Sequence, residues 1–113
     1  MVMVNTELME LAQRIQESPS LYLTEALGAN PYQKQIDIAD AVRSHRRVSV
    51  VGCNGSGKDW LAARLALWWA TAHYPAKVII TGPTYRQVDD VIFNEIRAAY
   101  RTSRAALGGR LFD

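Results

Sequence analysis

The sequence predicts a parallel α/β fold preceded by N-terminal helices. Two short apolar segments, residues 48–51 and 78–81, show no alternation with polar residues, which is typical of strands covered on both faces. Each is followed by a segment with helical spacing of apolar residues, 58–73 and 84–101. A glycine-rich loop joins the first strand to its helix. The order helix, strand, loop, helix, strand, helix indicates a parallel sheet with flanking helices.

The N-terminal segment predicts two short helices. Apolar residues recur at helical spacing over residues 8–15, and Pro19 is expected to end that helix. A second helix is expected over residues 21–27, with Gly28 closing it.

The next helix is expected to begin at Asn30. Asparagine is a favoured cap and Pro31 suits the first turn. Gln33 stands where its side chain can accept a hydrogen bond from the backbone N–H of the cap. The helix ends in a basic cluster that suits the negative end of its dipole, Arg43, His45, Arg46 and Arg47. The first predicted strand, residues 48–51, follows directly.

The helix over residues 58–73 is apolar on nearly every side, so we expect it to be buried. Pro75 interrupts it before the second predicted strand. The last helix is expected to begin near Thr84, which forms a capping box with Gln87.

Size and composition fit one globular domain. The 113 residues are 49% hydrophobic and 21% charged, with a formal net charge of +2, which is too small to imply nucleic-acid binding by itself. No apolar run approaches the roughly 20 residues of a membrane span, and a single cysteine favours a reducing cytoplasm. We divide the chain into a helical lead-in, residues 1–29, and an α/β portion, residues 30–113.

The loop between the first strand and its helix matches the P-loop pattern of glycine, four residues, glycine and lysine. Its glycines allow successive N–H groups to turn toward a phosphate, and the lysine is expected to reach the outer phosphates of ATP. The predicted nucleotide-binding residues of this loop are Gly52, Cys53, Asn54, Gly55, Ser56, Gly57, Lys58 and Asp59. A chance glycine-rich turn is the alternative interpretation.

Asp59 departs from the pattern, because serine or threonine normally follows the lysine and ligates Mg²⁺. A carboxylate is also a hard oxygen ligand, so Asp59 is the candidate metal-binding residue. Its negative charge should weaken triphosphate binding unless a metal lies between them.

Two flanking segments resemble the phage large terminase, the ATPase motor that packages viral DNA. Residues 28–33 resemble the segment that precedes the terminase P-loop. The resemblance implies that Tyr32 stacks on adenine and that Gln33 hydrogen-bonds its edge, although a core tyrosine and a capping glutamine are the structural alternatives. Residues 80–88 resemble the segment after the second terminase strand, which implies that Thr84 and Arg86 face nucleotide or DNA.

The resemblance covers roughly residues 20–104 and implies a RecA-like P-loop NTPase domain, truncated early. It also implies ATP and Mg²⁺ as cofactors, and double-stranded DNA, a portal and a small terminase subunit as partners, with a homo-oligomeric ring only for a full-length motor. The acidic strand that normally completes hydrolysis and the terminase nuclease domain are both missing. We therefore expect an ATP-binding fragment with little ATPase activity of its own.

Three other interpretations remain open. A small-molecule kinase shares the P-loop but usually begins close to it, whereas about fifty residues precede it here. A fragment of a superfamily-two helicase also places a glutamine upstream of the loop. A non-catalytic relic or interaction module would explain Asp59 and the missing acidic strand.

The basic series near the chain end, Arg97, Arg101, Arg104 and Arg110, is more typical of solvated helix arginines than of a DNA site.

Overall fold

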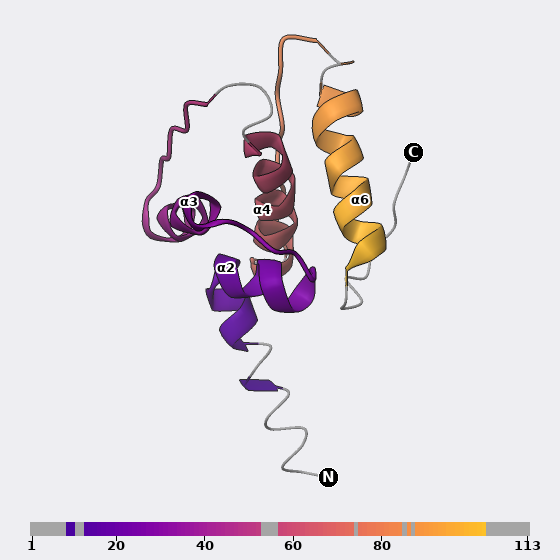
Figure 1. Ribbon diagram of the computed structural model, residues 1–113. Coiled ribbons are helices and arrows are strands. Elements are labelled where there is room, and N and C mark those ends of the chain that lie inside the picture. The colour runs from indigo at the N-terminus through magenta and orange to yellow at the C-terminus, as the bar shows by residue number, and fades with distance from the viewer. Residues whose placement is uncertain are drawn as a thin grey trace.

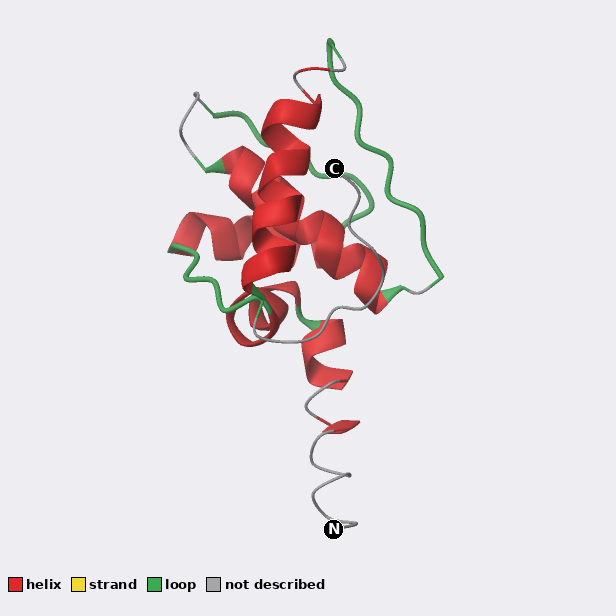
Figure 2. Cartoon of the chain, turned by 90° about the vertical axis from the view of Figure 1, so that its right-hand side faces the viewer, coloured by secondary structure: helices red, strands yellow, loops and turns green. Residues whose placement is uncertain are grey.

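A computed structural model describes residues 9–10, 13–52, 57–73, 75–84, 86 and 88–103. Over this part of the chain the protein consists of helices and connecting segments, and it contains no β-strand (Figures 1 and 2). The helical elements are α2 (Pro19–Leu21), η1 (Tyr22–Ala26), α3 (Gln33–Ser44), α4 (Lys58–Ala72), η2 (Val88–Phe93) and α6 (Asn94–Thr102), where η1 and η2 are π-helical turns. The prediction of an α/β, RecA-like P-loop sheet is therefore wrong.

The two predicted strands are extended segments without sheet partners. Residues 47–52 and 76–82 have no regular secondary structure, and the two segments run on different sides of α4 (Figures 1 and 2). Val51 is 97% exposed and Ile79 is 74% exposed. An apolar run predicts a strand only if a neighbouring chain segment pairs with its N–H and C=O groups, and the helical packing supplies none here.

We expect Ile79→Asp to change the free energy of unfolding by no more than about 0.5 kcal/mol, because an exposed side chain loses no packing. Leu23→Asp is the matched control, since Leu23 is fully buried and a charge there should unfold the protein. Urea unfolding followed by circular dichroism measures both. A large loss of stability in Ile79→Asp would contradict the exposed position of this segment.

Helix α4 lies at the centre of the molecule and contacts α3, α6, η1 and η2. Leu61 and Trp68 of α4 are each 2% exposed and pack into one cluster with Tyr22, Leu23 and Ala39. The predicted helix over residues 58–73 is thus confirmed, whereas its predicted burial holds for one face only, since Trp69 is 40% exposed. The cluster also joins the N-terminal helices to the rest of the chain, while the domain boundary at residue 29 stays a prediction.

Polar bonds fix the contact between α4 and the N-terminal helices. The Trp68 indole Nε1 donates to the Gln16 carbonyl at 3.0 Å, and the hydroxyl groups of Tyr22 and Thr71 are 3.1 Å apart. Burial raises the pKa of Tyr22, and the hydrogen bond with Thr71 opposes that shift. These bonds satisfy polar atoms that packing removes from water.

The first helical turns differ from the prediction in one respect. Residues 13–17 are helical, and Pro19 is the first residue of α2 instead of the end of the preceding helix. The Ser18 hydroxyl accepts a bond from the Leu21 N–H at 3.3 Å and caps the new helix, a role that suits serine before proline. The prediction for Gly28 is confirmed, since its φ of 68° is left-handed and the helical turns end at residue 27.

Helix α3 begins later than predicted. Its N-cap is Tyr32, so Asn30 lies outside the helix. Gln35, three residues after Tyr32, accepts a bond from the Tyr32 N–H through Oε1 at 3.1 Å. The capping glutamine is therefore Gln35, and the predicted pairing of Asn30 with Gln33 is wrong.

Helix α6 is tied to α4 by an ion pair. An Arg64 guanidinium nitrogen lies 2.7 Å from Glu95 Oε2 and also donates to the Trp60 carbonyl at 3.0 Å. The same guanidinium lies over the Trp60 ring, 4.2 Å from its centroid. Residues 88–102 form the helical segment that the sequence predicts over 84–101.

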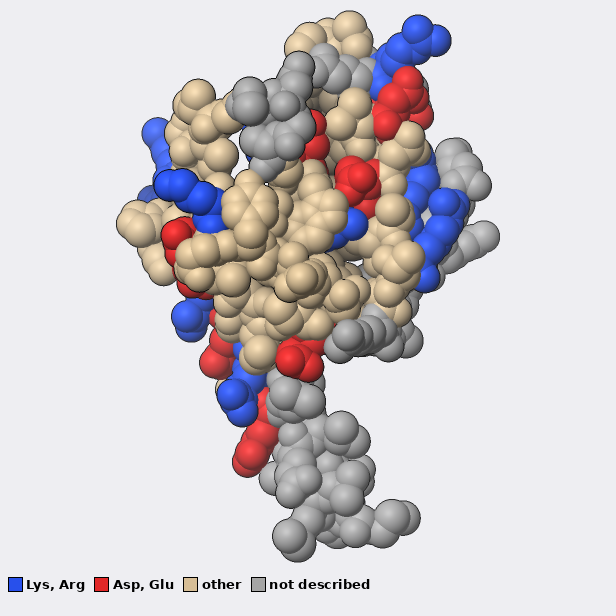
Figure 3. All heavy atoms as spheres, in the orientation of Figure 1, with Lys and Arg blue, Asp and Glu red and all other residues tan. Residues whose placement is uncertain are grey.

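The charged groups are mixed on the face shown in Figure 3, where acidic and basic side chains alternate among uncharged ones. None of the described helices combines the length with the apolar character that crossing a membrane requires.

Candidate functional site

The start of α4 holds the described part of the P-loop sequence. Gly57 is the N-cap of α4, and its φ of 88° is left-handed, a conformation that glycine adopts without steric penalty. Lys58 is the first residue of the helix. Residues Cys53, Asn54, Gly55 and Ser56 lie outside the described residues, so their predicted roles stay predictions. The flanking residues nevertheless show where the loop starts and ends.

The two ends of the loop meet through Lys58. Its ammonium group donates a hydrogen bond to the Gly52 carbonyl, across six positions of sequence. An ammonium has three donors, so this bond leaves two of them for another acceptor. The positive end of the α4 dipole lies at the same place, since α4 begins at Lys58.

Tyr32 lies beside this loop. A methyl group placed on Gly57 would stand 3.6 Å from Tyr32 Cε1 and 3.7 Å from its hydroxyl oxygen. Tyr32 is nevertheless 53% exposed, so part of it is available to a ligand. The structure therefore brings Tyr32, Gly57 and Lys58 together, as the resemblance implies; the stacking role of Tyr32 stays a prediction.

Gln35 lines the hollow beside the loop, whereas Gln33 does not line it and instead bonds to Asp37, which does. The Gln33 Nε2 donates to Asp37 Oδ1 at 2.9 Å on the exposed side of α3. Gln35 is 5% exposed, and its Nε2 donates to the Gly57 carbonyl at 3.3 Å. Sequence reasoning missed Gln35. The available signal was its position at the third residue after Tyr32, where a capping glutamine is expected.

A hollow of about 440 Å³ adjoins these residues, within the usual size of small-ligand pockets. One wall is polar and is supplied by the loop ends and the start of α3, with Gly52, Gly57, Lys58, Tyr32 and Gln35. The other is apolar and includes Val48, Val50 and Val51 from the extended segment. An amphipathic ligand with an anionic tail fits this combination of charge and apolar surface.

Asp59 is exposed and lines a different hollow, on the side of α4 that faces η2 and α6. This hollow of about 380 Å³ also contains Asp90, Asn94 and Glu95. Glu95 is already bonded to Arg64. Within the described ranges no group of three or more acidic, histidine or cysteine side chains could hold a metal ion. Asp59 alone fits Mg²⁺ only as one ligand beside the oxygens of a bound phosphate, which is the usual way proteins hold this ion.

The predicted residues of the second flanking segment lie at the start of η2. The Thr84 carbonyl accepts a bond from the Val88 N–H at 3.3 Å, as expected near a helix start, while Gln87 lies outside the described residues. The Arg86 side chain is 90% exposed, and its Nε lies 3.8 Å from Asp90 Oδ2. Exposed pairs of this kind contribute at most about 1 kcal/mol, so Arg86 can reorient readily.

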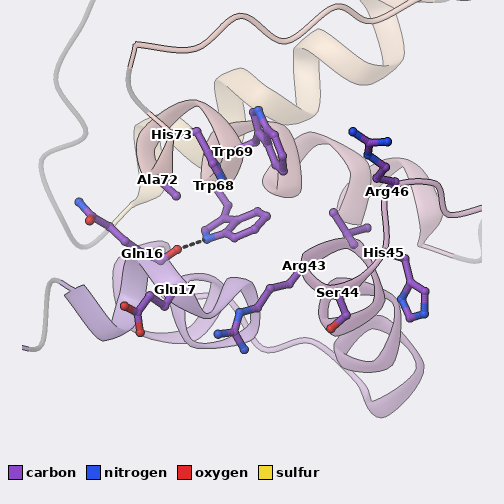
Figure 4. Close-up of a pocket in the computed structure, with 11 residues that line it drawn as sticks. Gln16, Glu17, Arg43, Ser44, His45, Arg46, Trp68, Trp69, Ala72 and His73 are labelled. Atoms are coloured by element: carbon purple, nitrogen blue, oxygen red, sulfur yellow. Dashed lines mark hydrogen bonds between the residues drawn. The ribbon is translucent and has the colours of Figure 1, made fainter.

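A larger hollow of about 570 Å³ lies at the opposite end of α4 (Figure 4). Its aromatic wall contains Trp68 and Trp69, and the Trp69 ring stacks on the His73 ring at 3.8 Å between centroids. Arg43 and Arg46, from the end of α3 and the residues after it, line another part of it.

The charges around this hollow nearly cancel. Arg43 and Arg46 are opposed by Glu17 and by the C-terminal ends of α3 and α4, which each carry about half a negative charge. The hollow beside the loop is lined by two lysines, Lys34 and Lys58, and one carboxylate, Asp37, and the positive end of the α4 dipole adds to the lysines. We therefore place the candidate site at the loop and not here.

Comparison of the chain with models of protein families, with curated proteins and with solved structures finds no match.

Proposed function

We propose that this protein binds ATP, with the phosphate tail at the P-loop sequence and the base against Tyr32. One observation carries the proposal: Lys58 and the left-handed Gly57 start the central helix next to the exposed Tyr32. A lysine, a helix N-terminus and an aromatic ring are the three groups that a nucleoside triphosphate needs nearby.

The electrostatics favour a polyanion at this end of α4. The helix N-terminus supplies about half a positive charge and Lys58 a full one. Asp59 opposes them with one negative charge, and it lines the hollow toward η2 and α6, which Gly57 and Lys58 line as well. A triphosphate that reaches both hollows could share Mg²⁺ with Asp59, and the ion would then reduce the repulsion between the two.

The origin proposed for the chain is a fragment of a terminase-like DNA-packaging motor. The support is the sequence of residues 28–33, the P-loop sequence and residues 80–88. Double-stranded DNA, a portal and a small terminase subunit belong to this proposal through the resemblance alone. The fold gives it no support. The motor's chemistry is built on a β-sheet, and the described part of the chain contains none.

A non-catalytic interaction module is the second candidate. Each of the two extended segments exposes apolar side chains, Val48, Val50 and Val51 in one and Val78 and Ile79 in the other, and such surfaces favour contact with a partner. The two candidates differ in whether nucleotide binds.

Lys58→Ala is expected to weaken ATP binding tenfold or more, since a hydrogen bond to a charged group contributes about 1.5–3 kcal/mol. Calorimetric titration of the folded protein with ATP and Mg²⁺ measures the affinity. Lys77→Ala is the matched control, because Lys77 is an exposed lysine of the other extended segment. The alkylation rate of Cys53, the sole cysteine, gives a second readout, because bound ATP should slow it. Wild-type protein that shows no ATP binding, or binding that persists in Lys58→Ala, would refute the proposal.

A further inference from the structure

Gln35 connects the two parts of the proposed nucleotide site. Its Oε1 accepts from the Tyr32 N–H at 3.1 Å, and its Nε2 donates to the Gly57 carbonyl at 3.3 Å. The second bond joins residues 22 positions apart in the sequence. The side chain is 5% exposed, so water can replace neither bond easily.

The bond to Gly57 orients the start of α4. The Gly57 carbonyl accepts two hydrogen bonds, from Gln35 and from the Leu61 N–H at 3.0 Å. Because the peptide group is planar and trans, the N–H of Lys58 points opposite to that carbonyl. Holding the carbonyl therefore directs the Lys58 N–H out of the helix N-terminus, where a phosphate would accept it.

The bond to Tyr32 fixes the backbone at the start of α3, which carries the aromatic ring. Tyr32 is the N-cap of α3, and its N–H is bonded to the amide oxygen of the same Gln35 side chain. One rigid amide group thus sets the spacing between the backbone that carries the aromatic ring and the backbone that faces the phosphates. Gln35 is 5% exposed, so it lines the hollow with only a small part of its side chain, and its amide is engaged by the two backbone groups.

We propose that Gln35 is a positioning residue that aligns the Gly57–Lys58 peptide and Tyr32 for a nucleoside triphosphate. The inference rests on the proposed ATP binding and deepens it. It assigns to Gln35 an effect on the phosphate tail, transmitted through the backbone of the loop. Gln33, two residues earlier, has no contact of this kind and bonds to Asp37.

Affinities of Gln35→Met for ATP, ADP, AMP and adenosine test the inference. Methionine matches glutamine in length and lacks both hydrogen-bonding groups. We expect ATP binding to weaken about tenfold and adenosine binding to change much less, so that the ATP-to-adenosine affinity ratio falls. Gln16→Met is the matched control, since the exposed Gln16 side chain lies away from the loop and should leave all four affinities unchanged.

A merely structural role would give another result. A destabilised protein binds every ligand less well in proportion to its folded fraction, which circular dichroism measures, so the affinity ratio would stay constant. A constant ratio overturns the inference. If Gln35→Met does not fold, Gln35→Leu serves instead, because it also removes both hydrogen-bonding groups and adds no charge; the same fall in the ratio is expected.

Failure of this inference is distinguishable from failure of the proposed function. Wild-type protein that binds ATP in a Lys58-dependent way, with an unchanged ratio in Gln35→Met, overturns only the role of Gln35. Wild-type protein that does not bind ATP overturns both.

Discussion

Trp68→Ala is expected to lower the free energy of unfolding by about 3–5 kcal/mol, the usual cost of truncating a buried tryptophan. Trp68 is 2% exposed and packs from the C-terminal half of α4 against Tyr22 and Leu23 of the N-terminal helices. Truncation would leave a cavity and would also leave the Gln16 carbonyl without the indole donor that now lies 3.0 Å away. Both losses act in the same direction.

Trp69→Ala supplies the control for this prediction. Trp69 is the next residue of the same helix, but it is 40% exposed and stacks on His73. Its truncation should cost much less, because much of the ring is already in water. Urea unfolding followed by circular dichroism gives both values. Equal losses for the two variants would mean that the helix is not oriented with Trp68 inward.

The helices could be predicted from the sequence because their signals are local. Apolar spacing over residues 58–73 and a turn-forming Gly28 depend on neighbouring residues only, and both predictions are confirmed. The placement of Lys58 at the start of the central helix followed from the same pattern. Element type was therefore reliable wherever the stabilising bonds lie within the element.

The strands could not be predicted reliably, because a strand depends on a partner elsewhere in the chain. Residues 48–51 and 78–81 have the composition of buried strands, yet Val51 and Ile79 are exposed. Apolar composition indicates a tendency to be covered and does not identify the covering segment. The P-loop pattern strengthened the wrong prediction, since that motif is usually found after a strand.

The candidate site was predicted in part. Tyr32, Gly57 and Lys58 are adjacent in the structure, although 25 residues separate the first two in the sequence. The resemblance assigned Gln33 to the base, and the expected helix start at Asn30 gave the same residue a capping role. A shift of two residues in a helix start moves a side chain to a different face, and here it moves the exposed Gln33 away and the buried Gln35 inward.

Gly57→Ala is expected to lower the free energy of unfolding for two separable reasons. Its φ of 88° is left-handed, which costs a residue with a side chain about 1–2 kcal/mol. The added methyl group would also lie 2.7 Å from Gln35 Nε2, so either the amide or the start of α4 must shift. Overpacking of this kind typically costs about 1–3 kcal/mol more.

A double-mutant cycle with Gln35→Ala separates the two reasons. Truncating Gln35 removes the atom that the new methyl group meets, and leaves the backbone penalty in place. The double variant should therefore be more stable than the sum of the single losses predicts, by about 0.5–3 kcal/mol. Urea unfolding of the four proteins measures this coupling.

Gly28→Ala is the control for the cycle, because Gly28 also has a left-handed φ of 68° but follows the N-terminal turns. Its loss of stability should add to that of Gln35→Ala without coupling. Simple additivity of Gly57→Ala and Gln35→Ala would show that the glutamine amide does not press on the start of α4. The contact that aligns the loop in the proposed site would then be absent as well, because the steric contact and the hydrogen bond involve the same amide nitrogen.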